Sequence, residues 1–313
     1  MGFFDWLKPS PPLDAALRAR VDQAAAAIDP RIRQLGTHEK ILAPAVTLAW
    51  DYCERLALAI PGPFAVAHAA FASDPLVHAL FGSADDIYRM LATSQGVREY
   101  LDGHPAETHC FALLGMRRKV AAGYGMRLAG EMVRGDEPVK TLSFADHTIG
   151  EVGASLDEVQ GRLARTMFDS LLQGLLPTVE ALRQERIALQ EDLALTRVRV
   201  RQGSADATRQ QAALESRLRE IAAALEPERL CADLAAHLAR PESALHLDTL
   251  RYRIDRFGVI AEDAAQKETD ALRFVELVGR DQRHWTVMLV KIDNAEARIA
   301  IERFEAGRRY IVI

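Results

Sequence analysis

Four side chains with metal-binding chemistry lie close together between His104 and Cys110: two imidazoles, the Glu107 carboxylate and a thiol. Zinc accepts ligands of these types, but they must converge on one point. The segment leads into a predicted strand, in which His109 and Cys110 would turn to opposite faces. No second cluster at zinc-site spacing occurs in the sequence. We therefore expect turn residues and a buried thiol here, and no metal site.

A second group joins an acid to an imidazole. Asp146 and His147 are adjacent, and Glu151 follows four residues later, just after a predicted strand. A carboxylate that orients an imidazole prepares it for general-base catalysis. Nothing in the neighbouring sequence supplies a nucleophile or a metal, so a turn into the next helix is favoured. With His104 and His109, this pair supplies the first residues to examine in any pocket.

Two other patterns do not meet the requirements of their motifs. The pair His38 and Glu39 lacks the second histidine of a zinc-protease helix, because Leu42 occupies that place. Gly123 and Gly125 lie within strand-like sequence, which favours a β-bulge over a phosphate-binding loop. The sequence therefore assigns no catalytic residue and no cofactor, and an enzyme is less expected than a binding protein.

Four arginines surround one predicted turn, with Asp206 as the acid that opposes them. They are Arg197, Arg199, Arg201 and Arg209. A positive end of this kind attracts acidic partners. The alternative is that arginines near a helix C-terminus only complement its dipole. Residues 169 to 251 contain no Phe, Trp or Tyr for base stacking, so we expect no sequence-specific nucleic acid partner.

The arginines lie at the end of a long heptad pattern that breaks near Gly203. Apolar residues recur at steps of four and three before and after the break. The seam consists of Phe168, Leu172, Leu175, Val179, Leu182, Arg186, Leu189, Leu193, Thr196 and Val200, followed by Leu214, Leu218, Ile221 and Leu225. This pattern predicts a long antiparallel helical hairpin, a coiled-coil arm. With about 24 residues in each limb, the arm would span on the order of 36 Å.

Arg186 and two prolines add detail to the predicted arm. Arg186 occupies a seam position, and we expect it to pair with Glu215 or Glu220 of the returning limb. Pro177 and Pro227 are placed symmetrically about the turn. Both limbs should therefore break at the same level.

Strand-like sequence flanks the arm on both sides. Before it, the runs 108–116, 120–132 and 139–148 are separated by 117–119 and 134–138, which suit hairpin connections. After it, four further strand-like runs precede a helix and a short terminal strand. These are 245–254, 257–261, 272–278 and 285–292, then a helix over 294–305 and a strand over 310–313. We expect the two β regions to be neighbours and leave open whether they share one sheet.

The predicted fold class is α+β, with the arm inserted between two β-containing regions. An N-terminal tail (1–12) precedes a helical domain, expected to be a bundle, over 13–104. An antiparallel β meander follows over 105–152. The long helix and arm occupy 155–226, with the tip near 203. The C-terminal α+β region, 227–313, should pack against 105–152.

Composition excludes several classes of protein. The 313 residues are 49% hydrophobic, and 39 Lys and Arg oppose 44 Asp and Glu, for a net charge of −5. These values exclude wholesale disorder and a generic polyanion binder. The three cysteines are far apart and odd in number, which favours a reducing compartment over a disulfide framework.

The N-terminal segment has no basic region followed by an apolar run, so no signal peptide is expected. We predict a cytoplasmic protein without a transmembrane segment. Phe3, Phe4 and Trp6 offer at most a weak contact with a membrane surface.

The leading functional hypothesis is a protein-interaction or scaffold protein. Its arm would bind a protein partner of unknown identity or a second copy of the chain. One alternative is an enzyme or a small-ligand-binding protein with a cleft between the helical domain and the β segments. The other is a binder of anionic surfaces through the basic tip of the arm.

Overall fold

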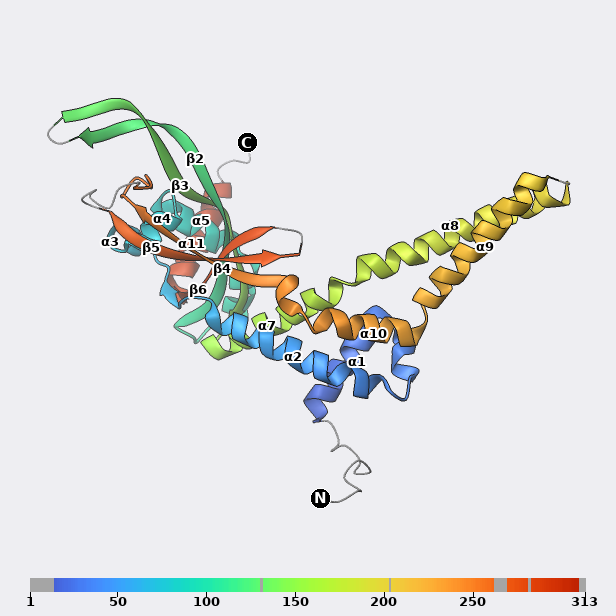
Figure 1. Ribbon diagram of the computed structural model, residues 1–313. Helices are drawn as coiled ribbons and strands as arrows, with labels where there is room; N and C mark the ends of the chain where they lie inside the picture. The colour runs from blue at the N-terminus through green and yellow to red at the C-terminus, as the bar shows by residue number, and fades with distance from the viewer. Residues whose placement is uncertain (1–13, 130–131, 203, 262–268, 281–282, 310–313) are drawn as a thin grey trace, which may run out of the picture. The chain divides into compact units, whose positions relative to one another are not determined.

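The computed structural model describes residues 14–129, 132–202, 204–261, 269–280 and 283–309, and all their side chains except those of 125–137, 308 and 309. The chain is a mixture of helices and one mainly antiparallel sheet. It divides into two compact units (Figure 1). Unit 1 combines Met1–Cys53 with Thr166–Ala244, and unit 2 combines Glu54–Arg165 with Leu245–Ile313. The tail residues Phe3, Phe4 and Trp6, the predicted tip at residue 203 and the predicted strand 310–313 lie outside the described residues.

Unit 1 is helical throughout its described residues. It contains α1 (Ala15–Ile28), the 3-10 helix η2 (Pro30–Gln34), most of α2 (His38–Ala59), the end of α7 (Leu156–Gln173), α8 (Leu176–Arg201), α9 (Ala205–Ala224), α10 (Pro227–Leu238) and the 3-10 helix η3 (Pro241–Ser243). Pro177 and Pro227 lie in the first turns of α8 and α10. Proline is tolerated there because the first helical N–H groups have no partner within the helix. The prolines therefore mark where these two helices begin.

Helices α8 and α9 pack side by side (Figure 1). The seam positions Val179, Leu193 and Thr196 of α8 are buried, as is Ile221 of α9. Two ion pairs join the helices. Arg217 Nε lies 2.7 Å from Glu185 Oε1, and Arg197 Nη2 lies 3.5 Å from Glu215 Oε1. The four-three pattern therefore brings the two helices together along one face.

The expected pairing of Arg186 is wrong. Glu215 is bound by Arg197 and Gln211, and Glu220 is bound by Arg217. Arg217 reaches both limbs, because it also contacts Glu185. Exposed ion pairs of Arg197 and Arg217 therefore join α8 and α9 at these acids.

Unit 2 contains the sheet and the remaining helices. The strands are β1 (Phe64–Ala65), β2 (His109–Ala129), β3 (Met132–Gly153), β4 (Leu245–Ile254), β5 (Asp270–Gly279) and β6 (His284–Asp293). The helices are α3 (Ala70–Ser73), α4 (Pro75–Leu80), α5 (Ala84–Thr93), α6 (Gln95–Gly103) and α11 (Asn294–Arg309), together with the end of α2 and the start of α7. The strand order is β3-β2-β6-β5-β4, and β1 pairs with β6. Antiparallel pairing of β2 with β6 therefore joins the two β regions in one sheet.

The predicted three-stranded meander is wrong, because residues 117–119 do not form a turn. Arg117, Arg118 and Lys119 lie within β2 and pair with Ala145, Phe144 and Ser143 of β3. The pleat explains why a charged triplet fits in a strand. Arg117 and Lys119 are exposed, whereas Arg118 turns to the other face and binds Glu276 of β5.

Among the later runs, 257–261 forms isolated bridges instead of a strand. Val259 bridges to Thr141, and Ile260 bridges to Ile254. Asp255 explains this, because its carboxylate accepts the N–H groups of Phe257 and Val259 and holds the backbone in a turn.

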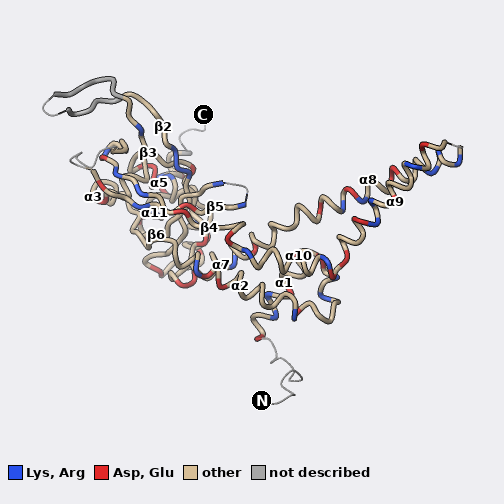
Figure 2. Tube along the Cα trace, in the orientation of Figure 1, with Lys and Arg blue, Asp and Glu red and all other residues tan. Residues whose placement is uncertain are grey.

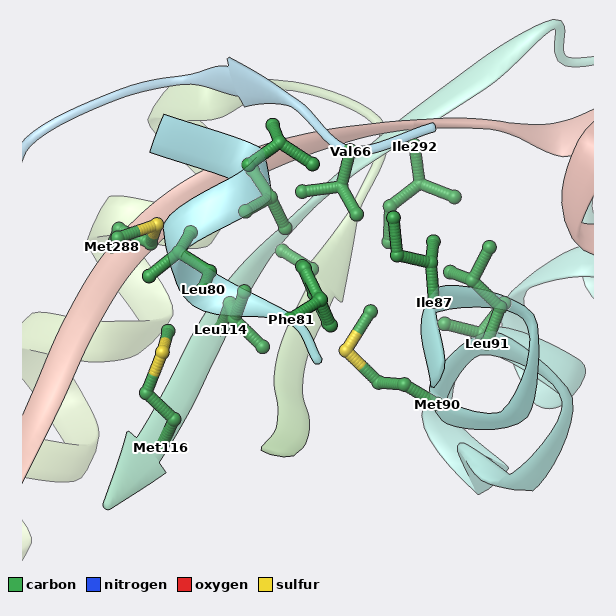
Figure 3. Packing of buried hydrophobic residues seen from close by; sticks show 14 of the residues in the cluster. Val66, Leu80, Phe81, Ile87, Met90, Leu91, Leu114, Met116, Met288 and Ile292 are labelled. Carbon is green, nitrogen blue, oxygen red and sulfur yellow. The ribbon is translucent and has the colours of Figure 1, made fainter. Parts of the chain in front are cut away.

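One face of the sheet packs on the helices of unit 2. Leu114, Met116, Met288 and Ile292 of the strands meet residues of α4, α5 and the loop after α4 (Figure 3). In this view, Leu80 belongs to α4, Phe81 to the loop after it, and Ile87, Met90 and Leu91 to α5. Apolar residues that alternate along the strands supply one side of the core, and amphipathic helices supply the other.

The described cysteines Cys53, Cys110 and Cys231 are buried and are not paired in disulfides. Burial raises the pKa of the Cys110 thiol to about 11, which keeps it protonated and unreactive. Among the described residues, no helix combines the length and apolar character needed to cross a membrane.

Candidate functional site

His104 and His109 are engaged in local structure. The Nδ1 atom of His104 lies 3.0 Å from the carbonyl oxygen of Tyr100, and the two rings stack with centroids 4.3 Å apart. His104 therefore ends α6. His109 begins β2, where its Nδ1 lies 3.0 Å from Thr108 Oγ1.

His147 binds the backbone and not its neighbour Asp146. Its Nε2 atom lies 2.7 Å from the carbonyl oxygen of Leu80, and its ring stacks on Phe81 with centroids 4.6 Å apart. Burial lowers the pKa of His147, which favours the neutral ring. Asp146 is instead exposed and lies 3.6 Å from Arg117 Nε. The pair does not form an acid–imidazole dyad.

The four candidate pocket residues do not meet. His109 lies at the start of β2, where it pairs with Asp293 of β6. His147 of β3 directly precedes Thr148, which pairs with Gly115 of β2. His109 and Gly115 are six residues apart on β2, a distance of roughly 20 Å along the strand. In the part of the chain that the structure describes, no three His, Cys, Asp or Glu side chains are placed to hold a metal ion.

The four arginines of the predicted arm tip divide into two kinds. Arg209 pairs with Asp206 at 2.6 Å, and Arg197 pairs with Glu215. Arg199 and Arg201 lie exposed in the last turn of α8, with no acidic partner within 4.0 Å among the described residues. In Figure 2 basic positions, all of them arginines, lie near the end where α8 and α9 approach each other, together with acidic ones. Two cations therefore remain available at this end.

A second apolar stripe follows α8 on the side that α9 does not cover. Ile187, Leu195 and Val198 are 48%, 63% and 52% exposed, and Ala194 is exposed between them. Ile187, Ala194 and Val198 recur at steps of seven and four, which places them on one helix face, where the exposed Glu191 interrupts the apolar residues. Sequence analysis followed the first stripe alone and missed this one, although its spacing was readable.

The opposite end of α8 is held by a buried acid. Asp29 is 5% exposed, and its carboxylate accepts hydrogen bonds from the backbone and side chain of Arg31 and from Arg183 at 2.9–3.2 Å. The hydrogen bonds from Arg31 hold the pKa of Asp29 below its ordinary value. Arg31 also donates to the carbonyl of Leu225, and Arg183 donates to that of Ile28.

This cluster, the root clasp (Asp29, Arg31 and Arg183), connects three elements: the turn from α1 to η2, the start of α8 and the end of α9. Sequence analysis missed it. The readable signal was Asp29 directly before Pro30, because Asp before Pro is typical of a helix N-cap.

A cavity of about 820 Å³ lies in unit 2, between α3–α4, the middle of β3 and the end of β4. None of His104, His109, Asp146 or His147 lines it. The cavity is therefore formed by residues that the sequence did not single out.

No known family model, curated protein or solved structure matches this chain.

Proposed function

We propose that this chain is a protein-interaction or scaffold protein that binds its partner through the helical hairpin formed by α8 and α9. The observation that carries the proposal is the outer stripe of α8: Ile187, Ala194, Leu195 and Val198, all exposed. These side chains contribute little to the fold, because they lie away from the seam. Burial of exposed apolar surface is the main driving force for association.

The root clasp supports this proposal. A helix pair that presents a binding surface must keep its orientation, or binding would also restrict its motion at a cost in entropy. Asp29 accepts hydrogen bonds from Arg31 and Arg183, and Arg31 reaches the end of α9 at Leu225. Both limbs are therefore tied to the same turn at their base.

The chemistry of the surface defines the partner. The outer stripe is a mainly apolar helix face interrupted by Glu191, and Arg199 and Arg201 lie at its end. It suits a second apolar helix that carries acidic residues beside its own stripe. A second copy of the chain is the first partner to test. In an antiparallel two-fold arrangement, Ile187 of each copy would meet Val198 of the other.

The test is the double variant Leu195→Ser/Val198→Ser. Leu48→Ser is the matched control, because Leu48 is an exposed leucine on α2 of the same unit. We expect sedimentation velocity to show self-association, or co-purification to show a retained partner, for the wild type and the control. The double variant should lose self-association or the retained partner, and its helix content should be unchanged. Retention of the partner by the double variant would contradict the proposal.

A shortened arm provides a second test. Deleting residues 190–216 and closing the gap with a short glycine-rich linker keeps the Glu185–Arg217 pair and the root clasp. The shortened chain should fold and lose its partner.

Binding to an anionic surface is distinguished by salt and charge. The variant Arg199→Glu/Arg201→Glu would abolish binding to vesicles that contain phosphatidylserine if the tip binds such surfaces. For a protein partner held by the stripe, the serine variant should weaken binding more than the glutamate variant.

Small-ligand binding is a second candidate function, supported by the cavity in unit 2. It does not involve the arm.

A further inference from the structure

The cavity in unit 2 has the size and the apolar floor of a ligand site. Its volume of about 820 Å³ lies within the range of about 300–1,000 Å³ that is usual for small-molecule pockets. The floor consists of buried apolar side chains from α4, the loop after it, β3 and β4: Leu80, Phe81, Leu142, Phe144 and Ile254. Figure 3 shows Leu80 and Phe81 in the core, so the floor is part of the packed interior.

One wall of the cavity is the turn Asp255–Gly258, which is held by hydrogen bonds. The Asp255 carboxylate accepts the N–H groups of Phe257 at 2.8 Å and Val259 at 2.9 Å. The carbonyl of Gly258 accepts the N–H of Leu142 at 2.8 Å, which ties the turn to β3. Gly258 has a φ of 76°, and a Cβ there would lie 2.7 Å from the Leu142 carbonyl oxygen. Only glycine fits this close approach.

The same turn is tied to the opposite wall. The Nε2 atom of His78 on α4 lies 2.8 Å from the carbonyl oxygen of Arg256, and its Nδ1 lies 3.1 Å from that of Phe71. Asp74 accepts the N–H of Leu76 at 2.8 Å and begins α4. These contacts hold both walls in place without a ligand, so the cavity is formed in advance.

Aromatic rings lie at the mouth. Phe257 is 73% exposed although it borders the cavity, and the Arg256 guanidinium lies 4.8 Å from its ring centroid. Phe71 lines the opposite wall, where its ring contacts His78 at 4.6 Å. An exposed phenylalanine on a rigid turn loses little entropy when it covers a ligand.

The charge of the lining selects the ligand. The lining contains three carboxylates, those of Asp74, Asp255 and Asp270, one guanidinium, that of Arg256, and the imidazole of His78. Both ring nitrogens of His78 lie at hydrogen-bond distance from carbonyl oxygens, and only the charged ring can donate to both. Asp74 and Asp255 retain acceptor capacity beyond their backbone hydrogen bonds, and Asp270 is exposed at the start of β5. Aromatic faces attract cations as well.

We infer that the cavity binds a small organic cation: an amine or quaternary centre attached to an aromatic or aliphatic body. The body lies on the floor formed by Leu142, Phe144 and Ile254, and the positive centre lies at the mouth near Phe257 and Asp270. This inference rests on the ligand-binding candidate and is independent of the arm.

Two probes of equal shape and opposite charge test the inference on the full chain: tetraphenylphosphonium and tetraphenylborate. We expect isothermal titration calorimetry to detect the cation and to find the anion bound at least tenfold more weakly. Phe257→Ala should weaken cation binding about tenfold, and Asp270→Asn about threefold, given the usual strength of cation–aromatic contacts and exposed charges. Tyr124→Ala is the matched control, because it removes another exposed aromatic of unit 2.

The location of binding is read from backbone amide shifts. Cation binding should move the amides of Ser143 and Gly258, which line the cavity, and leave Arg199 on α8 unmoved. If neither probe binds, the ligand site itself is overturned. If the anion binds more tightly than the cation, the inference that the ligand is a cation is overturned. If both probes bind equally and Phe257→Ala does not weaken their binding, they adsorb elsewhere on the protein and the inference is overturned as well. None of these outcomes bears on the arm, which is tested by the serine variant.

Discussion

The two ends of α8 are stabilised in different ways. At its start, Val179 is buried and Arg183 binds the buried Asp29 carboxylate together with Arg31. At its other end, Leu195 and Val198 are exposed and Arg199 has no acidic partner within 4.0 Å among the described residues. One helix therefore carries a part that the rest of the chain holds and a part that it leaves available.

This difference shows where stability and function separate along the helix. Loss of a buried, hydrogen-bonded charge costs several kcal/mol, whereas loss of an exposed apolar side chain costs almost nothing. Evolution can alter the distal end without unfolding the chain. The root tolerates much less change.

The largest expected effect comes from breaking the root clasp. Asp29→Ala leaves Arg31 and Arg183 without their carboxylate, and we expect a loss of about 3–5 kcal/mol in the stability of unit 1. Hydrogen exchange of the α8 and α9 amides measures this loss without reference to unit 2. Asp14→Ala is the control, because Asp14 is exposed and its side chain makes no capping bond. Equal protection in both variants would show that the clasp does not hold α8.

A smaller effect comes from the seam. Ile221 is fully buried between the helices, and Ile221→Ala should cost about 3 kcal/mol through lost burial and the cavity left behind. Leu195→Ala on the outer stripe should change stability by less than about 0.5 kcal/mol. Thermal and denaturant unfolding of the two variants compares the faces directly. A similar loss in both would mean that the outer stripe is packed after all.

The smallest expected effect is that of pH. The pKa of Asp29 is lowered in the folded chain, so its contribution is complete above the pKa of an unfolded aspartate, about 3.9. That contribution is lost as the pH falls through the lower folded value. Protection of the α8 amides should therefore decline below about pH 4, and Asp29→Asn should remove that part of the decline. An identical pH profile in the variant would exclude Asp29 as the source.

Local patterns predicted several elements closely. The run 245–254 coincides with β4, the run 285–292 lies within β6, and the helix over 294–305 lies within α11. Alternation and helical spacing are properties of neighbouring residues, so they can be read without knowledge of the fold. The same reasoning failed at Arg117–Lys119. A charged triplet is typical of a turn, but here Arg118 lies within a strand and pairs with Glu276 of a strand that is distant in the sequence.

The candidate site residues were chosen for their side-chain chemistry. Asp146 and His147 bind groups that are distant in the sequence, since Asp146 lies beside Arg117 and His147 binds the Leu80 carbonyl, 67 residues earlier in the chain. The residues that form the cavity are ordinary phenylalanines, leucines and aspartates. Their type carries no signal, because only their convergence makes a pocket.

The amino-acid sequence by itself determined helices α8 and α9 and strands β4, β5 and β6, because periodicity acts over a few residues. Tertiary structure decided what those elements are for. Asp29 and Arg183 meet across 154 residues, and Phe71 and Phe257 line one cavity from distant segments. Such contacts depend on how the chain folds back, and no local spacing encodes them.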